Sequence, residues 1–429
     1  MSRIRLKDGF RKLSMSERRR AFRDALELTD EELATDAAFA DLADVMTESS
    51  VGIMPVPMGI AGGFLIDGER YDVPLATEEP SVVAAATYAA RIISRAGGFT
   101  TRADAPVMTA QVFLEPRSAE QSVGELSARR DRLEAVAREE LASMEARGGG
   151  FHALRISEVP QTALTKIEID ADVRNAMGAN LLNTVAERLK SEAEQLGGGT
   201  GFIGILSNAA RARRAHAEFT VPVSRLGRSG VGGPEVARRI ELASRLADSD
   251  QDRAVTHNKG VMNGITALAV ATANDTRAIE AAAHAWAGRE HGYRSLTRFT
   301  VDGDALRGTI ELPLAFATVG GAVGFHPNAQ RALKLLGYPD APTLSRIAAA
   351  VGLAQNFAAV YALVSEGIQP GHMRLHAARV AYAAGARGDH VREVGRQLWE
   401  SGEISTEAAK RILANVEDDT EQRPSEENR

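Results

Sequence analysis

The sequence contains no cysteine, and this absence excludes several kinds of chemistry. Disulfides, Cys-ligated zinc or iron–sulfur centres and a thiol nucleophile all require cysteine. If the substrate is a thioester, the protein cannot take the acyl group onto a sulfur atom. Chemistry at the thioester carbonyl therefore has to be direct.

The chain also lacks a strong charge of either sign and a clear membrane-spanning run. Its net charge is −6, with 25% charged and 44% hydrophobic residues, which is typical of soluble globular proteins. The basic cluster at residues 18–20 lies beside Glu17 and Asp24, so we interpret it as a solvated helix face and expect no nucleic-acid partner. The basic N-terminus has no apolar core behind it, and the apolar run at residues 347–364 contains Gln355 and Asn356. We expect a cytoplasmic protein without a membrane partner.

A length of 429 residues exceeds what one hydrophobic core usually serves, so several domains are expected. Within residues 105–214 the order of elements is strand, helix, strand, strand, helix, strand, as in a ferredoxin-like split unit. The fold class predicted is α+β: a large mixed domain with an inserted ferredoxin-like, non-Rossmann domain and a small helical C-terminal region. The expected boundaries are 1–104 and 215–370 for the large domain, 105–214 for the insert, and 371–429 for the C-terminal region with a disordered acidic tail. The expected strands of the insert are 107–114, 151–156, 164–169 and 202–206, and its expected helices are 119–147 and 180–196.

Two adjacent carboxylates, Glu78 and Glu79, stand directly before Pro80 and a run of small apolar residues. Pro80 fits the first turn of a helix, Thr77 could cap that helix, and acids near its N-terminus interact favourably with the helix dipole. That is the structural interpretation. However, a carboxylate at the edge of a buried apolar helix is poorly solvated, which raises its pKa unless a cation or hydrogen bonds compensate. A catalytic proton donor is the alternative.

Two glycine-containing segments are candidates for a nucleotide site. Residues 199–204, GTGFIG, match the dinucleotide fingerprint as a string, but a helix precedes them and a strand follows, the reverse of what a Rossmann loop requires. We therefore reject this segment. Residues 172–180, DVRNAMGAN, end a strand and open a helix, so backbone N–H groups could approach a phosphate closely. An ordinary turn is the other interpretation.

Further candidates for chemistry are a lysine, an aspartate and two histidines. Lys259 lies in THNKGVMNG, which we interpret as a polar, glycine-containing turn; its ammonium could stabilise an oxyanion or simply be exposed. Asp275 could merely cap a helix. His372 and His376 have i, i+4 spacing, but the Glu of HExxH and a third ligand are missing, so we expect no metal. A single histidine as proton donor stays open.

Taken together, these motifs resemble those of 3-hydroxy-3-methylglutaryl-CoA (HMG-CoA) reductases, in particular the class II bacterial enzymes. The resemblance spans nearly the whole chain, and the order of the segments is more specific than any one of them. The matching segments are TESSVG, PLATEEPSVVAAA, GGFTT, DVRNAMGANLLNT, ILSN, THNKGVMNG, ATANDTRAIEA, GLAQN and EGIQPGHMRLH.

The resemblance implies an oxidoreductase that interconverts HMG-CoA and mevalonate plus CoA by two hydride transfers, through a hemithioacetal and mevaldehyde. Lys259 would stabilise the oxyanion, Glu79 would be the catalytic acid, Asp275 would tune both, and His372 would protonate the departing CoA thiolate. Glu78 would stay structural, because on a helix its side chain projects about 100° away from that of Glu79. The implied substrate-binding residues are Arg11, Ser81, Arg253 and Asn263. The implied cofactor-binding residues are Met177, Gly178, Asn180 and Asn208.

The same resemblance implies a homodimer with its active site at the interface and a mobile C-terminal flap that carries the histidine. Acids near Glu139 and Glu140 would repel a 2′-phosphate, so we expect NADH rather than NADPH. One departure is Ser49, which stands where the family has asparagine. Two alternatives stay open: a nicotinamide-dependent reductase of another acyl-CoA, and a non-catalytic sensor of CoA or dinucleotide. The sequence does not fix the direction of the reaction.

Overall fold

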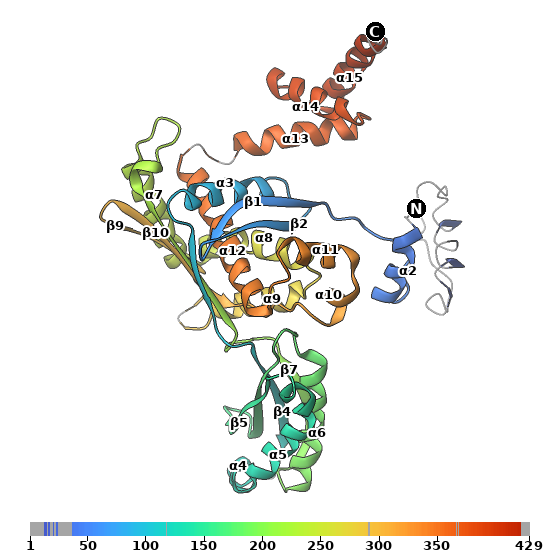
Figure 1. Cartoon of the computed structure of the whole chain (residues 1–429), viewed down its shortest axis with the longest axis vertical. Coiled ribbons are helices and arrows are strands. Elements are labelled where there is room, and N and C mark those ends of the chain that lie inside the picture. Colours follow the sequence, from blue (N-terminus) through green and yellow to red (C-terminus); the bar gives the residue numbers. More distant parts are fainter. Residues whose placement is uncertain are drawn as a thin grey trace.

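A computed structural model of the chain describes residues 37–116, 118–290, 292–365, 367 and 369–421, with a few residues between 13 and 24. The helical segments 369–375 and 417–421 are described by their backbone. Figure 1 shows three parts: a central body around a six-stranded sheet, a smaller part with the second sheet, and a group of helices at the C-terminal end. Arg11 and the end of the acidic tail lie outside the described residues.

The central sheet has the strand order β2-β1-β3-β8-β10-β9 and is mixed, because β1 and β3 are parallel whereas the other neighbours are antiparallel. The sheet contains two hairpins, β1–β2 and β9–β10. In the first, Asp67 and Gly68 have positive φ angles of 50° and 86°, as a tight primed turn requires. The strands are β1 (Met58–Ile66), β2 (Glu69–Ala76), β3 (Phe99–Ala103), β8 (Arg214–Pro222), β9 (Thr297–Asp302) and β10 (Ala305–Pro313).

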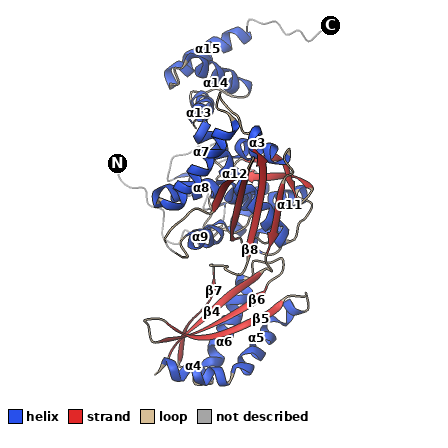
Figure 2. Ribbon diagram, turned by 90° about the vertical axis from the view of Figure 1, so that its left-hand side faces the viewer, coloured by secondary structure: helices blue, strands red, loops and turns tan. Residues whose placement is uncertain are grey.

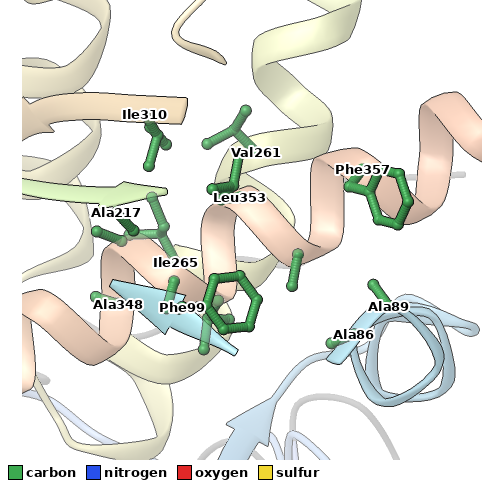
Figure 3. Close-up of a cluster of buried hydrophobic side chains, with 14 of the residues drawn as sticks. Ala86, Ala89, Phe99, Ala217, Val261, Ile265, Ile310, Ala348, Leu353 and Phe357 are labelled. Carbon is green, nitrogen blue, oxygen red and sulfur yellow. The ribbon is translucent and has the colours of Figure 1, made fainter. Parts of the chain in front are cut away.

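Helices α3, α8 and α12 pack against this sheet and against one another to form the main core. Figure 3 shows side chains from the strands, such as Phe99, meeting Val261 and Ile265 of α8 and Phe357 of α12. The α12 helix is long and apolar enough to cross a membrane, but 78% of its most apolar stretch is buried within the protein, as expected for a core helix. The helices of this part are α2 (Ala37–Met46), α3 (Val82–Ser94), α7 (Gly233–Ser249), α8 (Gln251–Ala271), α9 (Thr276–Ala287), α10 (Gly321–Phe325), α11 (Pro327–Leu335) and α12 (Ala341–Ser365), with a short 3-10 turn at Val223–Arg225.

The second sheet is antiparallel with the order β5-β6-β4-β7, and its helices cover one face (Figure 2). Together with the chain order, this is the arrangement of a ferredoxin-like split unit. The segment GTGFIG runs into strand β7, in agreement with its rejection as a Rossmann loop. One expectation is wrong in detail: the single helix at 119–147 is two helices that meet at Arg129. The elements are β4 (Val107–Glu115), α4 (Ala119–Ala128), α5 (Arg130–Glu145), β5 (Gly150–Val159), β6 (Leu164–Asp172), α6 (Ala179–Gln195) and β7 (Thr200–Ser207).

The C-terminal part consists of α13 (Gln369–Ala383), α14 (Asp389–Ser401) and α15 (Thr406–Glu421) around a small core of its own. It contacts the central body where the Nη2 atom of Arg379 on α13 donates a hydrogen bond to the carbonyl oxygen of Glu78, at 2.9 Å. The helical part that carries His372 therefore touches the loop that carries Glu79.

Candidate active site

A cavity of about 630 Å³ opens between α3, α8 and α12. Among the described residues that line it are five of those singled out in the sequence: Glu79, Ser81, Arg253, Lys259 and Asn263. They come from two distant segments, the loop before α3 and one face of α8. The fold thus brings these five side chains together.

Glu79 is held between two donors from α8. Its Oε2 atom contacts the Lys259 ammonium in an ion pair, and its Oε1 atom accepts a hydrogen bond from Nδ2 of Asn263 at 3.3 Å. Lys259 and Asn263 are four residues apart and therefore on the same face of the helix. The compensating cation that the sequence argument required for a half-buried carboxylate is present.

Two local expectations about Glu79 are wrong. Helix α3 begins at Val82, after Ser81 with a φ of 75°, so Glu79 and Pro80 precede the helix. The hydroxyl of Thr77 accepts from the N–H of Glu79 at 3.1 Å and so stabilises this turn, where it was expected to cap the helix. Because the two acids lie in a loop, the argument that helical spacing separates Glu78 from Glu79 does not apply.

Lys259 was expected in a turn, and this is also wrong: it lies within the 21-residue helix α8. A helix fixes the ammonium better than a turn would, since backbone and neighbouring packing are both defined. Asn258 anchors this part of α8, because its side chain bonds the carbonyl of Arg294 and the N–H of Leu296, both at 2.8 Å. The lysine is therefore presented from a rigid element.

Asp275 does not reach this cavity in the described chain. It caps α9, where its carboxylate accepts from the N–H of Ala278 at 3.0 Å, as the structural interpretation expected. Lys259 is twelve residues before the last residue of α8, so it lies about 18 Å from that end along the helix axis. Asp275 lies past the far end, and its side chain is 46% exposed.

The residues expected to bind the cofactor lie near that far end. Met177 and Gly178 occupy the loop between β6 and α6, and a Cβ at Gly178, with φ of 90°, would come within 2.6 Å of Val173. Strands β6 and β7 both pair antiparallel with β4, so both end at the same sheet edge, where Asn180 and Asn208 also lie. These four residues are thus grouped at one edge of the second sheet.

Hydrogen bonds connect this edge to the surroundings of Asp275. The Asn175 side chain accepts from the N–H of Ala341, and its carbonyl accepts from that of Thr318, both at 2.9 Å. Asn274, next to Asp275, bonds the backbone of Ala317 through both ends of its amide, at 2.7 and 3.1 Å. One chain therefore presents two separate groups of site residues, one at the cavity and one at the end of α8.

Three other residues singled out in the sequence are His372, Ser49 and Glu140. His372 lies on α13, of which the first turns are described by backbone alone. Ser49 has a φ of 61°, a left-handed conformation that asparagine adopts more readily than serine. Glu140 on α5 pairs with Arg188 at 3.8 Å, so this acid is partly neutralised.

Within the described part of the chain, no group of three potential metal ligands lies together.

Three residues that line the cavity were not predicted as site residues: Arg228, His257 and Gln355. Arg228 stacks over Tyr88 and Tyr361, at 4.8 and 5.1 Å from the ring centroids. Its segment, RLGRSGVGG, matches neither a GxSxG nucleophile elbow nor a Walker A loop, so nothing in the sequence indicated a role for it. His257 is 1% exposed, and burial, followed by the charge of Arg253, lowers its pKa to about 3. Gln355 also lines the cavity. In the sequence it was interpreted only as an interruption of an apolar run.

The lowered pKa of His257 predicts a pH dependence of stability. The unfolded chain binds a proton at this histidine below about pH 6.5, whereas the native state binds it only near pH 3, so stability falls as the pH falls through this window. His257→Gln should flatten the slope of melting temperature between pH 6.5 and 5, above the range where carboxylates titrate. His216→Gln is the control. Burial and the charge of Arg102 also lower the pKa of His216, but its side chain is more exposed than that of His257, so this substitution should change the slope less. Equal slopes in the parental and His257→Gln proteins would contradict the prediction.

Comparison with known proteins shows the family. The sequence profile of the family "Hydroxymethylglutaryl-coenzyme A reductase" matches residues 14–377. A 3-hydroxy-3-methylglutaryl-coenzyme A reductase of Archaeoglobus fulgidus is 42% identical over 420 residues, covering 95% of this chain and 94% of the relative. A probable reductase of the same name from Borreliella burgdorferi is 34% identical and covers 88% of this chain and 87% of the relative.

Solved structures give the same result. A 3-hydroxy-3-methylglutaryl-coenzyme A reductase from Streptococcus pneumoniae superposes with a TM-score of 0.74 at 38% identity, covering 95% of this chain and 99% of the other. A class II enzyme from the same organism, bound to NADPH in open conformations, has a TM-score of 0.73 at 38% identity, covering 94% and 100%. Fold and matches together define a nicotinamide-dependent oxidoreductase. The chain belongs to the hydroxymethylglutaryl-coenzyme A reductase family, so the family, the class II fold and the interconversion of HMG-CoA and mevalonate expected from the motifs are confirmed.

Proposed function

We propose that Lys259 and Glu79 form the catalytic pair of this HMG-CoA reductase. The observation that carries the proposal is their contact, with Asn263 on the second carboxylate oxygen, in the wall of a cavity large enough for an acyl group. The ammonium polarises the thioester carbonyl and stabilises the oxyanion as hydride arrives. Glu79, which shares a hydrogen bond with this ammonium, helps deliver the proton that the oxygen takes up when the aldehyde is reduced.

The thiolate leaves without an acyl-enzyme intermediate, which fits a chain that has no cysteine thiol to form one. His372 protonates the thiolate, and the contact between Arg379 and Glu78 supports this role because it brings α13 to the loop of the catalytic acid. Ser81 and Arg253 hold the acyl group, with Arg253 as the clamp for its free carboxylate. Arg11 contacts the CoA moiety. The nicotinamide dinucleotide binds at Met177, Gly178, Asn180 and Asn208.

We further propose that the active enzyme is a homodimer in which each site takes Glu79 and Lys259 from one subunit and Asp275 and the cofactor from the other. The distance along α8 supports this, because within one chain Asp275 lies beyond the end of the helix and away from the cavity that holds Glu79 and Lys259. Exposed apolar side chains also surround the far end of α8, beside a groove of about 840 Å³ lined by Met46, Met54 and Val270. Apolar patches of this kind usually mark interfaces. The domain boundaries 1–104, 105–214, 215–370 and 371–429 and a cytoplasmic location complete the proposal.

The test of function is a kinetic assay that follows nicotinamide absorbance with HMG-CoA, in both directions. Mevalonate and free CoA are the products expected. Turnover of another acyl-CoA without turnover of HMG-CoA would favour the first alternative, and ligand-induced thermal stabilisation without turnover would favour a sensor.

The same assay tests the cofactor prediction. We expect a higher kcat/KM with NADH than with NADPH, because Glu139 disfavours a 2′-phosphate. Arg188 beside Glu140 acts in the opposite sense, so the preference should be modest. Glu139→Gln should shift the ratio toward NADPH, whereas Glu134→Gln, earlier on α5 and paired with Arg130, should leave it unchanged. A preference for NADPH in the parental protein would overturn the prediction.

A further inference from the structure

His257, on the same face of α8 as Arg253, has a defined tautomer. The Nδ2 atom of Asn356 donates to the carbonyl of His257 at 2.9 Å, so the amide oxygen of Asn356 faces the hydroxyl of Thr297. That hydroxyl donates its one proton to Asn356 at 2.7 Å and is left to accept from Nε2 of His257, at 2.6 Å. The proton of the imidazole is therefore on Nε2, and Nδ1 carries a lone pair.

This lone pair has no partner among the described residues. The Nδ1 atom is buried and accepts no hydrogen bond, and the Oε1 atom of Gln355, another residue of the cavity wall, is in the same situation. A buried acceptor without a donor destabilises the protein, so a donor is expected here in the working enzyme. The low pKa of His257 keeps the ring neutral and Nδ1 an acceptor at ordinary pH.

Arg253 is a cavity-lining donor on the same face of α8 as His257. It precedes His257 by one helical turn, so their Cβ atoms are about 5–6 Å apart. Its side chain is half-buried and lines the same cavity, and its guanidinium makes no ion pair or hydrogen bond with any residue that the structure describes. Its charge is the second cause, after burial, of the lowered pKa of His257.

We propose that His257 is a positioning residue for Arg253: its Nδ1 atom accepts a hydrogen bond from the guanidinium and holds the remaining N–H groups toward the carboxylate end of the acyl substrate. A neutral acceptor suits this task. A carboxylate in the place of His257 would orient the guanidinium but cancel the charge that must attract an anionic substrate, whereas imidazole orients it and leaves the charge intact. The inference rests on the proposed role of Arg253 as the carboxylate clamp.

Two substitutions of His257 test the roles of its two ring nitrogens separately. Glutamine places an amide N–H near the position of Nε2 and keeps the bond to Thr297, but offers no acceptor at Nδ1. Asparagine places its oxygen near Nδ1 and loses the bond to Thr297. We expect His257→Gln to raise the KM for HMG-CoA about tenfold, with kcat and the KM for the dinucleotide nearly unchanged. His257→Asn should keep a near-parental KM although its melting temperature is lower. Equal KM values for the two variants, or KM values that follow the melting temperatures, would overturn the inference.

A double-mutant cycle distinguishes failure of the inference from failure of the clamp. In an Arg253→Ala background, His257→Gln should not change the KM further. If Arg253→Ala leaves the parental KM unchanged, the proposed role of Arg253 fails. If Arg253→Ala raises the KM and His257→Gln raises it again by the same factor, the clamp stands and the positioning role of His257 is wrong.

Discussion

Replacing Lys259 with alanine is expected to lower kcat by about two to three orders of magnitude, since removing one oxyanion stabiliser costs about 2.7–4 kcal/mol of transition-state stabilisation. The ammonium contacts Glu79 and lies at the edge of the cavity, where the thioester oxygen gains negative charge as hydride arrives. Substrate affinity should change much less, because the charge develops only in the transition state. Single-turnover measurements with saturating HMG-CoA and dinucleotide would measure the loss directly.

The melting temperature distinguishes a loss of catalysis in Lys259→Ala from a loss of folded protein. The Lys259 side chain is 58% exposed, and an ion pair with that exposure contributes little to folding, so the melting temperature of the variant should stay close to that of the parent. Lys334→Ala is the matched control, an exposed lysine on α11 outside the cavity, and should leave kcat unchanged. A folded Lys259→Ala protein with parental turnover would disprove the catalytic pair.

Local signals in the sequence predicted much of the framework correctly. The Asp67-Gly68 hairpin follows from residues that tolerate positive φ, and the second sheet follows from the order of its elements. The position of Gly178 between a strand and a helix was also predictable, because only glycine fits beside Val173 with that backbone. Each of these inferences depends on neighbours within a short stretch of chain.

The helix that carries Lys259 could not be predicted in this way. Glycines and asparagines disfavour helices, so residues 256–264 were interpreted as a turn. In the structure Gly264 allows α12 to pack closely, since a Cβ there would lie 3.0 Å from side-chain atoms of Gln355 and Val351. Packing between distant segments thus outweighs local propensity.

The environment of Glu79 could not be predicted from the sequence for the same reason. Its partners Lys259 and Asn263 are 180 and 184 residues away, and their approach depends on how α8 packs against β2 and α3. The separation of Asp275 from this pair was equally hidden. Motif order identified the family, but it did not show that the matching residues fall into two groups, one at the cavity and one beyond the C-terminal end of α8.

That separation makes a complementation experiment decisive. Lys259→Ala and Asp275→Ala chains should each be nearly inactive as homodimers, because both sites lack one essential group. In a mixed dimer, one site combines two defective halves, whereas the other takes Lys259 from the Asp275→Ala chain and Asp275 from the Lys259→Ala chain. With random pairing, half of the dimers are mixed, so about a quarter of the parental active sites should return.

The control uses two substitutions in the same group. Lys259→Ala and Glu79→Gln chains, co-expressed with the same two affinity tags, should recover no activity, since in their mixed dimers every site has one defective residue at the cavity. Mixed dimers purified through both tags should show about half of the parental kcat for the first pair and none for the second. If the first pair recovers no more than the second, Asp275 and Lys259 serve the same subunit, or Asp275 has no part in the reaction, and the shared site is wrong. If both pairs recover activity, the two cavity residues come from different subunits, and their contact within one chain is not the catalytic one.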